Sequence, residues 1–110
     1  MNIEYASNKL EKQLNTASEI KKAFGKMAVK ISQRLDEIRS SDTLHILMQI
    51  PAAKCHALTG NREGDWAVSI SGNHRMIFVI TNQPIPRLEN KSIDTAKVTD
   101  IKITGTEDYH

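Results

Sequence analysis

Residues 65–80, DWAVSISGNHRMIFVI, decide the fold class of this chain. Trp66, Val68 and Ile70 alternate with other residues, which is typical of a strand with one buried face. The Gly-Asn dipeptide at 72–73 is a two-residue hairpin signal. The apolar run that follows it predicts a central strand. The stretch therefore predicts an antiparallel hairpin within a sheet.

Further strands are expected on both sides of this hairpin. Residues 54–58, KCHAL, are a candidate strand, and the glycines and asparagine of the next segment predict a turn. Alternating residues predict an opening strand at 2–5 and a last strand at 98–104. Residues 81–97 hold two prolines and little periodicity, so a long surface loop is expected there.

The first half of the chain is expected to be mostly helical. Ser7 can cap a short first helix, and Thr16 with Glu19 forms a capping box for a second. Apolar residues then recur at steps of four and three, which predicts one helix of about five turns with a single buried stripe. The stripe consists of Ile20, Phe24, Met27, Ile31, Leu35 and Ile38. A shorter helix is expected before Pro51. The expected fold class is α+β, with N-terminal helices on one face of a small, mostly antiparallel sheet.

Length and composition limit the possible functions. With 110 residues, 39% of them hydrophobic, residues 1–110 are expected to form a single domain. The sequence lacks the roughly 20 apolar residues that cross a bilayer. It also lacks a secretory signal, and its one cysteine fits a cytoplasmic protein without membrane contact. The net charge of +2 requires any RNA-binding site to be a local arrangement.

Metal and nucleotide sites are not expected. The histidines are scattered and lack the paired spacing of zinc ligands, and no glycine-rich phosphate loop follows a strand. Neither a metal nor another cofactor is therefore predicted. Cys55 and His56 are neighbours on an expected strand, so their side chains should diverge, with Cys55 as a small buried apolar residue.

Polar groups at the sheet are the remaining candidates for chemistry. An antiparallel sheet can bring His56 and Arg75 close to the final triplet, Asp108, Tyr109 and His110. Imidazoles exchange protons near neutral pH, arginine holds phosphates, and tyrosine stacks on bases. These groups suit RNA cleavage. The residue types alone favour a plainer interpretation, in which His56 is a hydrogen-bonded core histidine, Arg75 forms a surface ion pair and the triplet is solvated.

Spaced sequence motifs favour the RNA-cleavage interpretation over the plainer one. Residues 55–80, CHALTGNREGDWAVSISGNHRMIFVI, and 98–110, VTDIKITGTEDYH, resemble the RelE/ParE toxin superfamily, and specifically its HigB-like branch of type II toxin–antitoxin systems. That branch has a histidine before Leu-Lys-Gly, then Gly-Asp-Arg-x-Gly-x-Trp, an aromatic-Arg pair opening a strand, and a final Asp-Tyr-His. The resemblance implies a RelE-like fold.

The resemblance also implies a function and a partner. Such toxins enter the ribosomal A site and cleave messenger RNA there without a metal, through attack by a ribose 2′-hydroxyl. The implied catalytic residues are His56, Arg75, Asp108, Tyr109 and His110, and the implied RNA-binding residues are Lys54, Arg62 and His74. The implied partner is a HigA-like helix-turn-helix antitoxin in a hetero-oligomer, besides ribosome and messenger RNA.

Three positions depart from the motif, and other functions stay open. Thr59 replaces a lysine, Asn61 replaces an aspartate, and His74 replaces an aromatic residue. Losing the lysine weakens a phosphate contact, whereas His74 keeps a ring for stacking. One alternative is a ParE-like toxin that binds DNA gyrase, although such toxins do not need the final triplet. Another is a weakened toxin that mainly binds its antitoxin in transcriptional autoregulation.

Overall fold

Five strands form one sheet in the order β1-β5-β4-β3-β2. The computed structural model describes residues 1–108. The strands are β1 (Asn2–Tyr5), β2 (His56–Ala57), β3 (Asp65–Ser69), β4 (His74–Ile80) and β5 (Asp100–Asp108). β1 is parallel to β5, and the other neighbouring strands are antiparallel. The prediction of a central strand after residue 73 is confirmed, because β4 is the middle strand.

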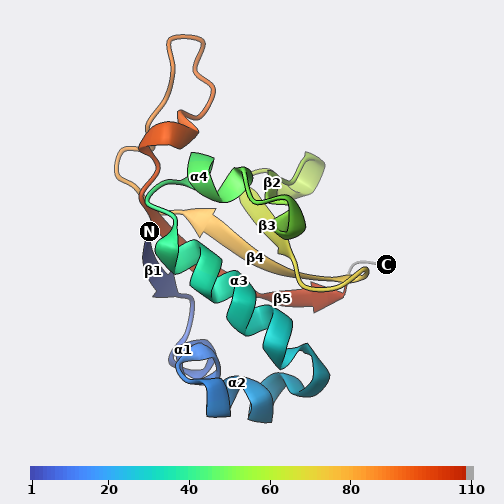
Figure 1. Ribbon diagram of the computed structural model, residues 1–110. Helices are drawn as coiled ribbons and strands as arrows, with labels where there is room; N and C mark the ends of the chain where they lie inside the picture. The colour runs from blue at the N-terminus through green and yellow to red at the C-terminus, as the bar shows by residue number, and fades with distance from the viewer. Residues whose placement is uncertain (109–110) are drawn as a thin grey trace.

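Helices cover one face of this sheet, with α3 crossing it diagonally (Figure 1). The helices are α1 (Asn8–Leu14), α2 (Ala17–Phe24), α3 (Ala28–Ser40) and α4 (Leu44–Met48), and the short 3₁₀ turns are η1 (Gly25–Met27), η2 (Pro51–Ala53), η3 (Gly60–Arg62) and η4 (Thr95–Lys97). The expected α+β class is confirmed. In the described residues, no helix has the length and apolar character needed to cross a bilayer.

Hydroxyl side chains begin the first two helices as predicted. The Ser7 hydroxyl accepts a hydrogen bond from the Leu10 N–H at 3.1 Å, and the Thr16 hydroxyl accepts one from the Glu19 N–H at 3.1 Å. Each bond satisfies a backbone donor that has no partner within the helix. These caps fix where α1 and α2 begin.

The predicted five-turn helix is wrong in one respect, because Gly25 divides it. Gly25 has φ +56°, a backbone conformation that other residues rarely adopt, and η1 begins at Gly25 and separates α2 from α3. The stripe changes direction there. Ile31 and the other α3 members are fully buried, whereas Phe24 and Met27 at the break are only partly buried against the core.

The core lies between α3 and the helix-facing side of the sheet. Trp66 on β3 is paired with Phe78 on β4, and their rings stack with centroids 6.4 Å apart. Arg34 on α3 is buried beside this core. Its guanidinium donates to the backbone oxygens of Ser69 at 2.6 Å and Ala52 at 2.9 Å. Arg34 thereby fixes the end of β3 and the η2 turn relative to each other.

Three boundaries differ from the sequence prediction. Residues 70–73 form a four-residue connection and not a two-residue turn, because buried Ile70 packs into the core before the chain reverses. The strand expected at 54–58 is only His56–Ala57, because Lys54 has left-handed backbone at φ 47°. β5 continues to Asp108, past a bulge between the pairs Ile77↔Gly105 and Phe78↔Ile103.

The surface loop predicted at 81–97 is confirmed. It projects from one end of the sheet (Figure 1). An isolated bridge between Arg87 and Ile93 closes its outer part, and Leu88 is exposed near its tip.

Candidate functional site

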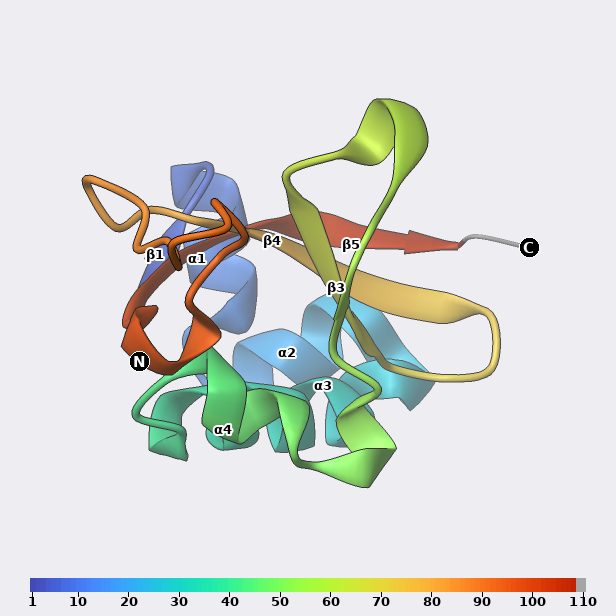
Figure 2. The same cartoon turned by 90° about the horizontal axis from the view of Figure 1, so that it is seen from above.

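The face of the sheet that lies away from α3 carries the candidate residues. Met76 and Phe78 point into the core, so Arg75 and Ile77 point to the opposite face. Paired residues continue that face from His56 to Ala67 and on to Ile77. Ala67 and Ile77 are nevertheless 1% and 4% exposed, so part of this face is covered. The segment that carries η3 lies on this side (Figure 2).

A hollow of about 80 Å³ opens at this face, and the predicted residues Lys54, His56 and Arg75 all line it. The remaining lining comes from β3, at residues 67–69. A water molecule occupies about 30 Å³ in the liquid, so the hollow accepts a group the size of two or three waters. It can therefore hold a phosphate group or a sugar hydroxyl, while the rest of a nucleotide stays outside.

His56 is exposed at the rim of the hollow, and its ring orientation is fixed by the backbone. Nδ1 of His56 lies 2.7 Å from the carbonyl oxygen of Lys54. Because a carbonyl oxygen only accepts hydrogen bonds, this contact requires a proton on Nδ1. Nε2 of the neutral ring then carries the lone pair, which suits it to accept a proton.

Arg75 is held by an acidic residue that the sequence analysis did not select. Its Nε donates to Oε1 of Glu107 at 2.8 Å, and a terminal nitrogen lies 2.7 Å from the same oxygen. Arg62 binds Glu107 through two further bonds, at 3.1 and 3.2 Å. The hydrogen bond from Arg62, followed by that from Arg75, holds the pKa of Glu107 below its ordinary value against the opposing effect of desolvation.

Arg62, expected to bind RNA, contacts two carboxylates. Besides Glu107 it binds Asp65, with 3.0 Å between Nε and Oδ2. These two partners raise the pKa of its guanidinium. No residue type or motif signalled Glu107, because its role depends on the strand register that places it beside Arg75.

The structure separates His74 and Asp108 from the hollow. They are cross-strand partners, with 3.9 Å between His74 Nε2 and Asp108 Oδ2. Each is the strand neighbour of Arg75 or Glu107, so their side chains point to the opposite face. Of the residues expected in one patch, His56 and Arg75 line the hollow and Asp108 does not. Tyr109 and His110 lie outside the described residues.

Cys55 agrees with its expected role as a buried apolar residue. It is 8% exposed, and burial raises the pKa of its thiol to about 12. Cys55 is buried and His56 is exposed, so the two side chains diverge as predicted. Within residues 1–108, no three His, Cys, Asp or Glu side chains gather in a group that could hold a metal ion.

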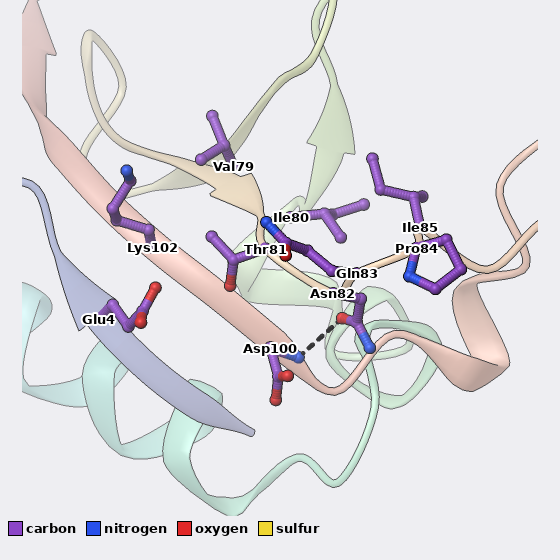
Figure 3. A pocket seen from close by; sticks show the side chains of 10 residues that line it. All are labelled: Glu4, Val79, Ile80, Thr81, Asn82, Gln83, Pro84, Ile85, Asp100 and Lys102. Carbon is purple, nitrogen blue, oxygen red and sulfur yellow. Dashed lines mark hydrogen bonds between the residues drawn. The ribbon is translucent and has the colours of Figure 1, made fainter.

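A second, polar hollow of about 890 Å³ lies at the base of the 81–97 loop (Figure 3). Side chains of Glu4, Lys102 and Asp100 line its sheet side. The Asn82 amide oxygen accepts from the backbone N–H groups of Thr99 and Asp100, at 3.1 and 3.0 Å. Asn82 thereby fastens the loop to the start of β5.

Solved toxin structures share this fold. The YoeB/ParE toxin from Agrobacterium tumefaciens is 12% identical, with both chains fully covered and a TM-score of 0.54. YafQ from E. coli is 14% identical over 97% of this chain and 91% of its own, with a TM-score of 0.56. A YoeB–YefM complex from Staphylococcus aureus gives 19% identity over 100% and 97%, with a TM-score of 0.54.

These likenesses establish the fold. The chain has the fold of the RelE/YoeB toxins, as the motifs predicted. No protein-family model matches the sequence. No curated protein matches it either. The HigB-like assignment rests on the sequence motifs.

Proposed function

We propose that this chain is the toxin of a type II toxin–antitoxin system and an endoribonuclease that cleaves messenger RNA on the ribosome. The observation that carries the proposal is the shared hollow, which brings His56 and Arg75 together from β2 and β4. The HigB-like motifs assign RNA chemistry to the same two residues. The fold, shared with solved toxin structures, is consistent with this assignment.

The proposed reaction is an internal transfer at phosphorus. Nε2 of His56 accepts the proton of a ribose 2′-hydroxyl, and the 2′-oxygen then attacks the adjacent phosphorus. Arg75 stabilises the additional negative charge on the phosphate. A second imidazole, that of His110 in the final triplet, protonates the leaving 5′-oxygen. The products are a 2′,3′-cyclic phosphate and a 5′-hydroxyl end, and no metal takes part.

RNA binding is assigned mainly to Lys54, at the hollow. The motifs add the ring of His74, which can stack on a base but lies on the opposite face of the sheet from the hollow. The motifs also assign RNA binding to Arg62, whose carboxylate contacts favour a different role. The modest net charge fits a toxin whose substrate is positioned by the ribosome.

We further propose a HigA-like helix-turn-helix antitoxin that forms a cytoplasmic hetero-oligomer with this chain. The HigB-like motifs carry this assignment. The Staphylococcus aureus structure, in which YoeB is in complex with YefM, supports a protein partner for the fold.

Expression of this chain, alone and with the protein encoded beside it, tests the function. The proposal expects translation to stop, messages to be cut within codons, and both effects to disappear in His56→Ala and on coexpression. Intact messages with a DNA-damage response would favour the gyrase alternative instead. Intact messages and undamaged DNA, together with binding to the neighbouring protein, would favour the antitoxin-binding alternative.

A further inference from the structure

Four charged side chains are linked by ion pairs on the face of the sheet that lies away from α3. Asp65 lies on β3, Arg62 in η3, Glu107 on β5 and Arg75 on β4. Asp65 is bound to Arg62, Arg62 to Glu107, and Glu107 to Arg75. We propose that Asp65, Arg62 and Glu107 are positioning residues that hold the Arg75 guanidinium at the hollow. This inference rests on the proposed function, which supplies the reaction that Arg75 serves.

The contact pattern of Arg62 shows what this residue does. Its Nε donates to Asp65, and its two terminal nitrogens donate to the two carboxylate oxygens of Glu107. All three guanidinium nitrogens therefore hold carboxylates, and the paired bonds to Glu107 fix the plane of both groups. Arg62 is built to orient Glu107 and not to hold a phosphate.

Glu107 transmits this orientation to Arg75. Its Oε1 receives Nε of Arg75 at 2.8 Å and the Arg62 terminal nitrogen at 3.1 Å. The Arg75 side chain is only 18% exposed, and the same residue lines the hollow with His56. A long, flexible side chain is thus restrained at the place where its position matters for the reaction.

The set of four charged side chains positions Arg75 and does not itself attract RNA. Its two guanidinium and two carboxylate groups have no net charge. Replacing Glu107 by glutamine removes one negative charge, so the net charge beside the hollow rises by one and the attraction for RNA becomes stronger. The same replacement removes a charged partner from Arg75. Positioning thus predicts a lower kcat without a higher KM, whereas a purely electrostatic role predicts a lower KM with unchanged kcat.

The kinetic test compares Glu107→Gln and Arg62→Lys with the wild type in ribosome-dependent cleavage. Glu4→Gln is the matched control, because Glu4 is a carboxylate at the distant, polar hollow. We expect kcat to fall about 10- to 100-fold in both test variants, since a shift of about 1 Å can cost roughly a hundredfold. Glu107→Asp, which keeps the charge, should recover part of the loss. Unchanged kcat in folded test variants overturns the inference.

A second measurement needs no substrate. In wild-type protein, the Nε–H proton of Arg75 should give a dispersed NMR signal that is protected from exchange. Both Glu107→Gln and Arg62→Lys should move it toward the signal of free arginine, although Arg62 is not its direct partner. If the Arg75 signal does not move in either folded variant, the proposal that these side chains hold Arg75 is overturned. If Glu107→Gln does not fold, Arg62→Lys and Asp65→Asn carry the same test.

The two measurements separate the inference from the proposed function. Wild-type protein that never cleaves RNA overturns the proposed function and with it the role in cleavage. If the Arg75 signal moves in the variants in that case, it still supports the inference that Asp65, Arg62 and Glu107 hold Arg75 in place. Cleavage by the wild type, with both variants equal to it, overturns only the positioning role.

Discussion

Arg75 on β4 and Glu107 on β5 are directly paired across the sheet, and their side chains meet at 2.7 Å. His74 and Asp108, the preceding and following residues, pair on the opposite face. The register of β4 and β5 therefore places Glu107, and not Asp108, beside Arg75. The acid beside the proposed phosphate-binding arginine is thus a residue outside the Asp-Tyr-His motif.

Removing the charge of Glu107 should make folding stability less sensitive to acid. The folded-state pKa of Glu107 lies below its ordinary value of 4.5, so its ion pairs stabilise the protein fully above pH 4.5. This stabilisation is lost as pH falls through the folded-state pKa. The difference in free energy of unfolding between wild type and Glu107→Gln should therefore narrow below pH 4.5. Urea unfolding at pH 7 and below pH 4.5 measures it, and a constant difference would argue against the ion pairs.

Ile31 should matter more to stability than Phe24. Ile31 is 0% exposed, so Ile31→Ala should cost about 2 to 5 kcal/mol. Phe24 is only partly buried, so Phe24→Ala should cost about half the roughly 3 to 5 kcal/mol of a buried phenylalanine. Denaturant unfolding of both variants gives the comparison. A larger loss for Phe24→Ala would mean that α2 packs more deeply than described.

Gly25 should be needed for its backbone conformation alone. A side chain at Gly25 would meet no atom within 4 Å, but its φ of +56° is strained for other residues. Gly25→Ala should therefore cost about 1 to 2 kcal/mol. Gly72→Ala is the control, because Gly72 has equal space and no positive φ, and should change stability by less than about 0.5 kcal/mol. Equal effects in thermal unfolding would contradict a strained break between α2 and α3.

Cys55 should be inert in the folded protein. Burial raises the pKa of its thiol from 9.0 to about 12, so the reactive thiolate is scarce at pH 8. An aromatic disulfide reagent should label Cys55 only slowly without urea and rapidly in urea. The raised pKa also implies that stability declines as pH rises from 9 toward 12, because only the unfolded thiol ionises there. Rapid labelling of the folded protein would show that Cys55 is accessible.

Local patterns were enough to predict most of the fold. The alternation around Trp66, the capping hydroxyls and the helical stripe depend on nearby residues, and each led to the correct type of element. The break at Gly25 was missed because an isolated glycine in a helical pattern is often tolerated. The end of β5 was placed too early, since a bulge depends on the partner strand.

The site was predictable only in part. The motifs selected His56 and Arg75, and the sheet brings both to one hollow. Glu107 could not be predicted from the sequence, because no local pattern shows which residue faces Arg75. A shift of one residue in strand register exchanges the two faces of the sheet. The contacts of Arg62 could not be predicted for the same reason, because one of its partners, Glu107, is far away in the sequence.

Arg75 at the hollow is proposed to stabilise a phosphate during RNA cleavage. The most direct test incubates programmed ribosomes and a short messenger RNA with wild-type protein or Arg75→Ala, each checked for folding by circular dichroism. We expect the wild type to produce 2′,3′-cyclic phosphate and 5′-hydroxyl ends, and Arg75→Ala to do so at least about a hundredfold more slowly. Intact messenger RNA with the wild type, or equal rates for both proteins, would contradict the proposed role of Arg75.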